Sequence, residues 1–167
     1  MGEAVSKFEK KIANIFSKKY GLMVNSGSSA LTLANNVLNF KKGDEIITPC
    51  LNFGTAVSSI ILSGAKPIFV DVETETLQID LNKIEEKITK KTKAICIVHY
   101  LGLPVDIRKV KKIALKHDLY IVEDCALALG AKYYNKHVGT IGDVGVFSFY
   151  PVKHITTAEG GMMILNN

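Results

Sequence analysis

The sequence predicts an α/β fold in three layers, with a mostly parallel central sheet and helices on both of its faces. The main observation is that short apolar runs of strand length alternate with helical patterns along all 167 residues. The composition agrees, because 47% hydrophobic and 22% charged residues suit one domain with a sizeable core and exclude a disordered or collagen-like chain. Ligands of such sheets bind beyond the carboxyl ends of the strands, so candidate residues are expected there.

Strand and helix signals follow one another through the first half of the chain. The helices show apolar residues at helical spacing, the strands are short apolar runs, and Pro49 and Gly64 end two of these elements. Asp80 is the expected N-cap of the last helix of this half. In order, we expect a helix at 5–16, a strand at 22–24, a helix at 31–38, a strand at 45–48, a helix at 57–62, a strand at 67–70 and a helix at 80–88.

The second half keeps the alternation and adds a hairpin, for which Asn135 and Lys136 supply the turn. Pro151 follows an apolar strand and turns the chain, because proline cannot continue a strand ladder. In order, we expect a strand at 94–98, a helix at 105–117, a strand at 119–122, a hairpin at 131–138 and strands at 144–149 and 162–165.

The turn 25–30 joins a strand to a helix and is rich in serine and glycine. A helix N-terminus presents free backbone N–H groups, so a phosphate would bind well at this turn. The alternative is that Ser28 or Ser29 only caps the helix, which is the commoner use of such residues. Phe53 lies in another strand-to-helix loop, where it either stacks on a flat ring or packs in the core.

Lys153 follows the strand 144–149 and is the candidate reactive amine. A lysine at the end of a buried strand loses hydration, which favours the neutral amine that attacks a carbonyl. Together with a phosphate site, an aromatic ring and the strand-end carboxylate of Asp124, it completes the groups needed to hold pyridoxal phosphate. Asp124 would keep the pyridine nitrogen protonated, and Lys153 would move protons between substrate and cofactor. The alternative is that Lys153 is an ordinary surface lysine.

Charge and cysteine content bound the other functions. The net charge of +5 comes from lysines spread along the chain, which indicates a solvated surface and no nucleic-acid partner. No run is long and apolar enough to span a membrane, and the histidines lack metal-ligand spacing. Cys50, Cys96 and Cys125 are scattered and odd in number, which favours a reducing cytoplasm. A Rossmann domain is not favoured, because the turn 25–30 lacks the glycine triplet.

Two segments at the ends of predicted strands, 123–130 and 148–161, carry a resemblance to a known family. The sequence resembles the DegT/StrS family of sugar aminotransferases over essentially the whole chain, most specifically in Glu123-Asp124-x-Ala126, Gly130 and Ser148-Phe149-Tyr150-Pro151-x-Lys153-x-Ile155-Thr156-Thr157-x-Glu159-Gly160-Gly161. The resemblance implies the large domain of the fold type I transferases that depend on pyridoxal phosphate. It implies that residues 1–167 are this cofactor-binding domain, with the small C-terminal domain absent.

The resemblance also implies a role for most of the candidate residues. In that reading Lys153 is the Schiff-base lysine, Asp124 the partner of the pyridinium, Ser28 and Ser29 the backbone donors to the phosphate, Ser148 a hydroxyl donor to it, and Phe53 the aromatic stacked on the ring. His99 and Tyr100 follow the strand 94–98 and are predicted to line the substrate pocket. The implied reaction transfers the amino group of glutamate to a nucleotide-linked keto sugar, for surface polysaccharides or secondary metabolites, in a homodimer that shares its active sites.

Two departures from the family pattern leave other functions open. Leu127 stands where many members carry glutamine or histidine near the phenolic oxygen of the cofactor, and leucine cannot donate a hydrogen bond. The chain opens directly on a helical pattern and closes just after a strand, which indicates a fragment of a longer protein. One relative has histidine in place of the lysine and acts as a dehydrase, whereas this chain has Lys153. The alternatives are therefore a dehydrase-like enzyme and a non-catalytic fragment that acts through dimer contacts.

Overall fold

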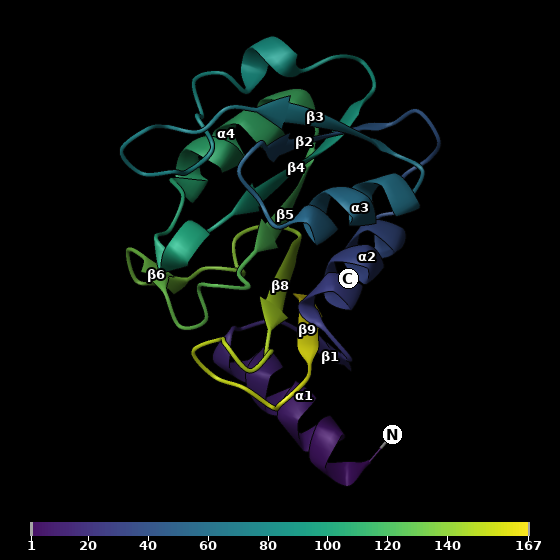
Figure 1. Ribbon diagram of the computed structural model, residues 1–167, viewed down its shortest axis with the longest axis vertical. Helices are drawn as coiled ribbons and strands as arrows, with labels where there is room; N and C mark the ends of the chain where they lie inside the picture. The colour runs from purple at the N-terminus through teal and green to yellow at the C-terminus, as the bar shows by residue number, and fades with distance from the viewer. Residues whose placement is uncertain (1, 167) are drawn as a thin grey trace.

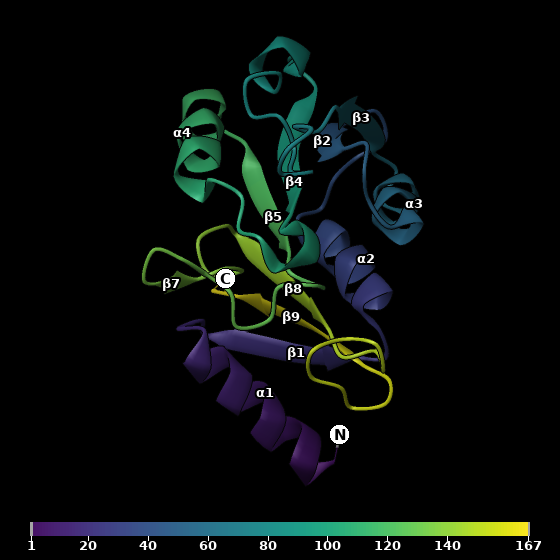
Figure 2. The same ribbon diagram turned by 60° about the vertical axis from the view of Figure 1, so that its left-hand side comes forward.

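The computed structural model describes residues 2–166 and contains a seven-stranded sheet between two layers of helices (Figures 1 and 2). Its strands lie in the order β1-β9-β8-β5-β4-β2-β3. They are β1 (Tyr20–Val24), β2 (Glu45–Pro49), β3 (Lys66–Val70), β4 (Thr92–Val98), β5 (Tyr120–Asp124), β8 (Val144–Ser148) and β9 (Gly161–Leu165). A separate hairpin pairs β6 (Lys132–Tyr133) with β7 (Lys136–His137).

Only β9 runs against its neighbours in this sheet. It pairs antiparallel with β1 and with β8, whereas β2 with β3, β2 with β4, β4 with β5 and β5 with β8 pair in parallel. The parallel strands therefore end at one edge of the sheet. Because β9 runs antiparallel to both β1 and β8, β1 points the same way as β8 and also ends at this edge. The predicted three-layer α/β fold with a mostly parallel sheet is confirmed.

Helices cover both faces of the sheet. The helices are α1 (Glu3–Ile15), α2 (Gly27–Val37), α3 (Gly54–Leu62) and α4 (Ile107–His117), with short 3-10 turns η1 (Glu85–Lys87) and η2 (Tyr100–Gly102). No helix within residues 2–166 is long and apolar enough to cross a membrane.

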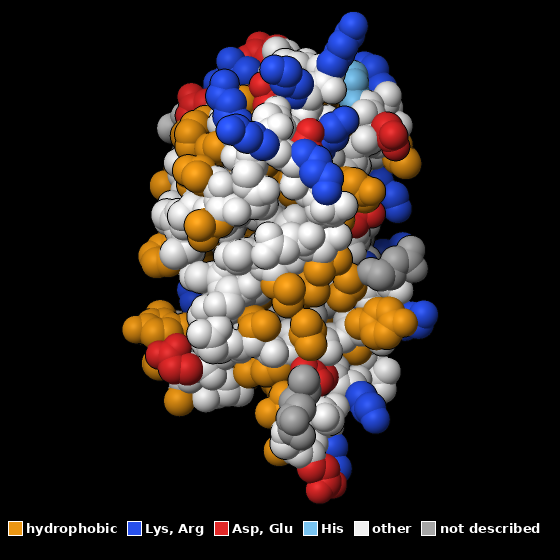
Figure 3. All heavy atoms as spheres, turned by 90° about the vertical axis from the view of Figure 1, so that its right-hand side faces the viewer, with side chains coloured by type: hydrophobic (Ala, Val, Ile, Leu, Met, Phe, Trp, Pro, Cys, Tyr) orange, Lys and Arg blue, Asp and Glu red, His pale blue; other side chains and the backbone are white. Residues whose placement is uncertain are grey.

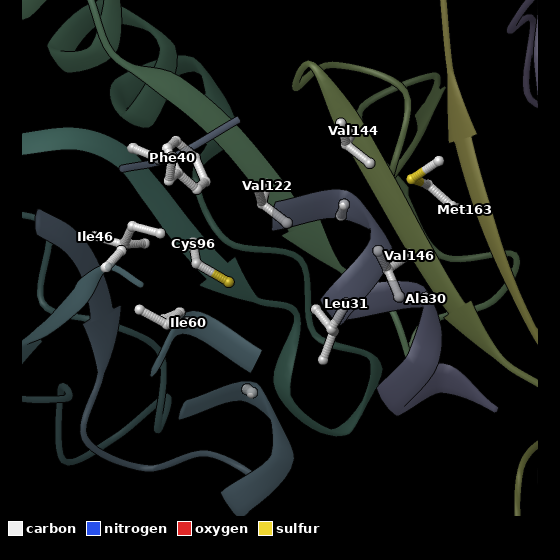
Figure 4. Close-up of a cluster of buried hydrophobic side chains, with 14 of the residues drawn as sticks. Ala30, Leu31, Phe40, Ile46, Ile60, Cys96, Val122, Val144, Val146 and Met163 are labelled. Carbon is white, nitrogen blue, oxygen red and sulfur yellow. The ribbon is translucent and has the colours of Figure 1, made fainter. Parts of the chain in front are cut away.

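The core is divided by the sheet into two sides. On one side, α2 and α3 bury Leu31 and Ile60 against Val122 and Val146 of the sheet (Figure 4). On the other side, α4 packs in one apolar cluster and α1 in another. Figure 2 shows these two helices apart from each other. Because successive strand residues point to opposite faces, Asp124 shares the α2 side with Val122, and Glu123 faces the α4 side.

The predicted helix at 80–88 is wrong, since this segment forms only the 3-10 turn η1. The Asp80 carboxylate was expected to cap a helix, but it accepts a hydrogen bond from the Asn82 N–H at 3.0 Å. Such a local turn competes with the helix for backbone donors. Buried apolar side chains on both sides of the turn pack into the α4 side of the core, which holds the segment in its bent path.

Candidate active site

The carboxyl edge of the sheet gathers the ends of β1, β2, β4, β5 and β8. Residues far apart in the sequence meet there, because each strand end is followed by a loop or a helix that begins at this edge. Figure 2 shows the start of α2 beside the loop that joins β8 to β9. This is the edge at which the sequence placed its candidate residues.

The first turn of α2 is capped by Ser26, not by Ser28 or Ser29. The Ser26 hydroxyl accepts a hydrogen bond from the Ser29 N–H at 3.1 Å and donates to the Ser29 hydroxyl at 3.0 Å. The Ser29 N–H is therefore already used, whereas the Ser28 N–H precedes it in the turn and has no intrahelical acceptor. The open donors of this helix end include the Ser28 N–H and the hydrogen of the Ser29 hydroxyl, and both suit an anion.

Ser148 ends β8 directly beside the first residue of α2. A Cβ atom added to Gly27 would lie 2.9 Å from the Ser148 Cβ and 3.2 Å from its Oγ, so only glycine allows this approach. The Ser148 hydroxyl is thereby brought to the helix N-terminus. The structure unites Ser28, Ser29 and Ser148 at one place.

Asp124 ends β5 on the α2 side of the sheet and is buried. One carboxylate oxygen accepts the Ala126 N–H at 3.0 Å, and the other accepts no hydrogen bond from residues 2–166. Burial raises the pKa of this carboxyl, while the Ala126 hydrogen bond and the charge of Lys153 partly oppose that increase. A buried carboxylate with an open oxygen is suited to a cationic partner.

Lys153 lies in the loop after β8 and is half-buried. Its backbone N–H donates to the Tyr150 carbonyl at 2.9 Å, which fixes the turn after the strand. Within residues 2–166 its ammonium group forms no ion pair, yet its charge lowers the pKa of Asp124. Asp124 at the end of β5 and Lys153 in the loop after β8 both lie at the carboxyl edge of the sheet.

Phe53 is the N-cap residue of α3, and 75% of its surface is exposed. It is not a core residue, which leaves its ring available to a ligand at this edge. The neighbouring turn of α3 is joined to α2, because the Ser28 hydroxyl donates to the Thr55 hydroxyl at 3.0 Å. Thr55 was not among the predicted residues, and only the packing of the two helices reveals it.

The structure does not bring His99 to the candidate site. Its ring is fully buried on the α4 side, where Nε2 lies 3.1 Å from a Glu123 carboxylate oxygen. Its Nδ1 accepts the Val105 N–H at 3.1 Å, so both ring nitrogens are used inside the protein. Tyr100 is half-buried in η2 at the carboxyl edge and remains a predicted pocket residue.

Glu123 is a buried residue for which the sequence predicted no role. Its carboxylate accepts four hydrogen bonds: from His99, and from the N–H groups of Gly139, Ile141 and Gly142 at 2.7, 2.8 and 2.5 Å. Burial alone would raise its pKa, but these donors outweigh that effect and hold the pKa below its ordinary value. An acidic residue inside an apolar strand was the available signal, because such a carboxylate requires several donors.

A metal site at this cluster is not supported by the donor set. His99, Glu123 and Cys125 offer ligand atoms within 4.8 Å of one another. However, the imidazole and the carboxylate are already hydrogen-bonded, and burial raises the pKa of the Cys125 thiol, which opposes the thiolate that a metal would need. The cluster is therefore a structural hydrogen-bond network.

Comparison with known proteins identifies relatives along the whole chain. The model of the DegT/DnrJ/EryC1/StrS aminotransferase family matches residues 1–167. GDP-perosamine synthase from Escherichia coli O157:H7 is 45% identical over 166 residues, which cover 99% of this chain and 46% of that protein.

Solved structures show the same fold. An aminotransferase from Psychrobacter cryohalolentis matches with a TM-score of 0.96 and 39% identity, over 99% of this chain and 42% of that chain. A GDP-4-keto-6-deoxymannose-3-dehydratase with a trapped PLP-glutamate geminal diamine matches with a TM-score of 0.95 and 39% identity, over 100% of this chain and 45% of that one. The chain thus spans less than half the length of these relatives.

Proposed function

The chain belongs to the DegT/DnrJ/EryC1/StrS aminotransferase family, and we propose that residues 1–167 are the cofactor-binding large domain of a nucleotide-sugar aminotransferase that uses pyridoxal phosphate. The observation that carries this proposal is the convergence of an anion site, a buried carboxylate and an amine at one sheet edge. The match to less than half of each relative supports the view that a further domain completes the enzyme.

The residues at this edge fit the cofactor in charge and shape. Its phosphate suits the N-terminus of α2, where the close contact between Gly27 and Ser148 adds a hydroxyl to the helix donors. The open oxygen of Asp124 suits a protonated pyridine nitrogen, since a positive charge would offset the cost of burying the carboxylate. Phe53 offers an exposed ring for stacking.

The chemistry is then divided between the cofactor and the chain. When bound, pyridoxal phosphate supplies an electron sink that stabilises a carbanion beside the amino group. Lys153 would hold the cofactor through its amine and would move the proton at the reacting carbon. Asp124 keeps the ring nitrogen protonated, and Ser28, Ser29 and Ser148 orient the phosphate.

We propose glutamate as the amino donor and a nucleotide-linked keto sugar as the acceptor, in surface polysaccharide or secondary-metabolite synthesis. Support comes from the GDP-perosamine synthase relative and from the dehydratase structure that contains a PLP-glutamate adduct. The three cysteines are free within residues 2–166, which supports a reducing cytoplasm as the compartment.

Dehydration is the second candidate function, and the similarity to GDP-4-keto-6-deoxymannose-3-dehydratase favours it. Lys153 argues for transamination, because a lysine can hold the cofactor covalently and release it to the donor, whereas histidine stands at this position in the dehydrase relative. The two reactions yield different products from one keto sugar, so they are separable by mass.

We further propose that the full-length protein is a homodimer with shared active sites. Large apolar side chains lie exposed at the carboxyl edge in Phe53, Leu101, Val152 and Ile155. Hydrophobic side chains also gather over the lower half of the face seen in Figure 3, whereas basic and acidic side chains are interspersed at its upper end. Exposed apolar patches of this kind mark interaction sites.

The first test locates the cofactor. The full-length protein is incubated with pyridoxal phosphate, reduced with borohydride, digested and examined by mass spectrometry, alongside Lys153→Ala and the exposed-lysine control Lys136→Ala. We expect a visible absorption band and a cofactor-modified Lys153 peptide in the wild type and the control, and neither in Lys153→Ala. A wild type without band or modified peptide would contradict the cofactor assignment.

The second part of the test distinguishes the reactions. The loaded protein is given glutamate and GDP-4-keto-6-deoxymannose, and the sugar product is identified by mass. An amino sugar is the expected product. A deoxy sugar without the added nitrogen would favour the dehydrase, and an unchanged sugar with both substrates bound would favour a non-catalytic chain.

A further inference from the structure

We propose that Glu123 and His99 are positioning residues for Asp124, which they hold from the face of the sheet opposite the cofactor. The inference rests on the proposed function, because it assigns Asp124 to the pyridine nitrogen. Neither residue touches the candidate cofactor site, since both lie fully buried on the α4 side.

Side chains along β5 alternate between the two faces of the sheet. Glu123 and Asp124 are consecutive residues that point to opposite faces, so an anchored Glu123 side chain fixes the backbone that carries Asp124. His99 adds a second link to the same backbone, because its N–H donates to the Asp124 carbonyl at 3.0 Å while its ring binds Glu123. The end of β5 is therefore held at two points: the Asp124 carbonyl by the His99 backbone N–H, and the Glu123 side chain by the His99 ring.

The hydrogen bonds of the Glu123 carboxylate also join the strands that carry the candidate site. The Glu123 carboxylate binds the loop 139–142, which leads into β8 and therefore toward Ser148. Lys18 reinforces this loop from the end of α1, because its Nζ donates to the Gly142 carbonyl at 2.9 Å. The buried carboxylate thus adds a second link between the strands that carry Asp124 and Ser148, beside their direct parallel pairing.

Only an ionised carboxylate at position 123 satisfies the four N–H donors that surround it. Each of its two oxygens accepts two N–H groups, and no other group in the network can serve as the acceptor. In Glu123→Gln the new NH₂ group faces two N–H donors whichever way the amide is turned. The loop 139–142 or the His99 ring must then move, and the end of β5 moves with it.

The experiment compares two cofactors on the full-length protein. Pyridoxal phosphate carries the ring nitrogen that Asp124 is proposed to bind, and 1-deazapyridoxal phosphate has a carbon there. The dissociation constant of each is measured by equilibrium dialysis for the wild type and Glu123→Gln. We expect Glu123→Gln to weaken pyridoxal phosphate binding by about tenfold or more, and to change the affinity for the deaza cofactor by less than about threefold.

Two further variants keep the test decisive. His99→Gln retains a donor for Glu123 but loses the ring, so we expect a smaller loss of pyridoxal phosphate affinity in this variant. It replaces Glu123→Gln as the test variant if Glu123→Gln fails to fold. Thr92→Val is the matched control, because the buried Thr92 side chain accepts one part-buried hydrogen bond, from the Thr89 N–H at 2.9 Å, at the opposite end of the sheet. It should leave the ratio of the two affinities unchanged.

The outcomes separate the inference from the proposed function. An equal loss of affinity for both cofactors in Glu123→Gln, or no loss for either, would overturn the positioning role and leave Glu123 as a purely structural residue. A wild type that binds pyridoxal phosphate no more tightly than the deaza cofactor would instead contradict the proposed role of Asp124.

Discussion

Asp124 is buried at the end of β5, and burial raises the pKa of its carboxyl above the ordinary value. A folded state with the raised pKa binds the proton more tightly than the unfolded chain, so stability falls as the pH rises above the unfolded pKa. Without cofactor, Asp124 therefore destabilises the fold at neutral pH. A residue kept for function at the expense of stability behaves in this way.

We predict that Asp124→Asn raises the Tm of the cofactor-free protein at pH 7 and that this gain disappears near pH 4. The amide oxygen can still accept the Ala126 N–H, so the change removes the buried charge and keeps this hydrogen bond. The gain should be a few degrees, since about 1 kcal/mol moves the Tm of a domain this size by roughly 2–4 °C. Thermal unfolding followed by circular dichroism across this pH range measures it.

The control for this prediction is Asp71→Asn. The pKa of Asp71 is lowered, chiefly by the Val72 backbone hydrogen bond, so loss of its charge should give no gain in Tm. Addition of pyridoxal phosphate should reverse the order of wild type and Asp124→Asn, because ligand binding stabilises the form that binds it more tightly. A lower Tm for cofactor-free Asp124→Asn at pH 7 would refute the conflict between charge and burial.

Helices α2 and α3 both begin with a glycine at the carboxyl edge, but the two glycines have different surroundings. A Cβ atom at Gly27 would meet Ser148 at 2.9 Å, whereas nothing lies within 4 Å of a Cβ atom at Gly54. The first turn of α2 is thus fitted against β8, and that of α3 is open. The difference makes the two positions a matched pair.

We predict that Gly27→Ala separates the α2 N-terminus from Ser148 and weakens pyridoxal phosphate binding by about tenfold or more. Gly54→Ala should keep the affinity and raise stability by up to about 1 kcal/mol, because alanine favours the helix more than glycine does. Fluorescence titration of the cofactor and urea unfolding measure the two effects. Equal affinities in the two variants would argue against phosphate binding at this helix end.

Exposed apolar residues lie both at the carboxyl edge, which carries the candidate active site, and on other surfaces such as that of α4. Val152, at the carboxyl edge, is 78% exposed, and Leu115, on α4, is 75% exposed. Because the proposed dimer shares its active sites, the contact should include the carboxyl edge. Val152 and Leu115 therefore test the interface with similar exposure at two different surfaces.

We predict that Val152→Asp weakens dimerisation of the full-length protein by about tenfold or more, because a buried unpaired charge is costly at an interface. Leu115→Asp should leave the dimer unchanged. Sedimentation equilibrium over a range of protein concentrations measures both. The shared-site dimer would be rejected if Leu115→Asp dissociates the protein and Val152→Asp does not.

The sequence alone determined most elements of this protein and predicted the residues of its candidate site. Alternating strand and helix patterns are local, so they predicted the three layers, and strand ends predicted Ser28, Ser148, Asp124 and Lys153 at one edge. The helix predicted at 80–88 failed because buried side chains and the Asp80 turn outweighed a weak local preference.

Only the tertiary structure decided how these groups face one another. The order that places β9 between β1 and β8 requires the pairing of β1 with β9, whose residues are more than a hundred positions apart. The inward position of His99 and the four donors of Glu123 arise from loops whose paths no local pattern encodes. Local propensity acts over a few residues, whereas burial and hydrogen-bond partners are settled when distant segments pack together.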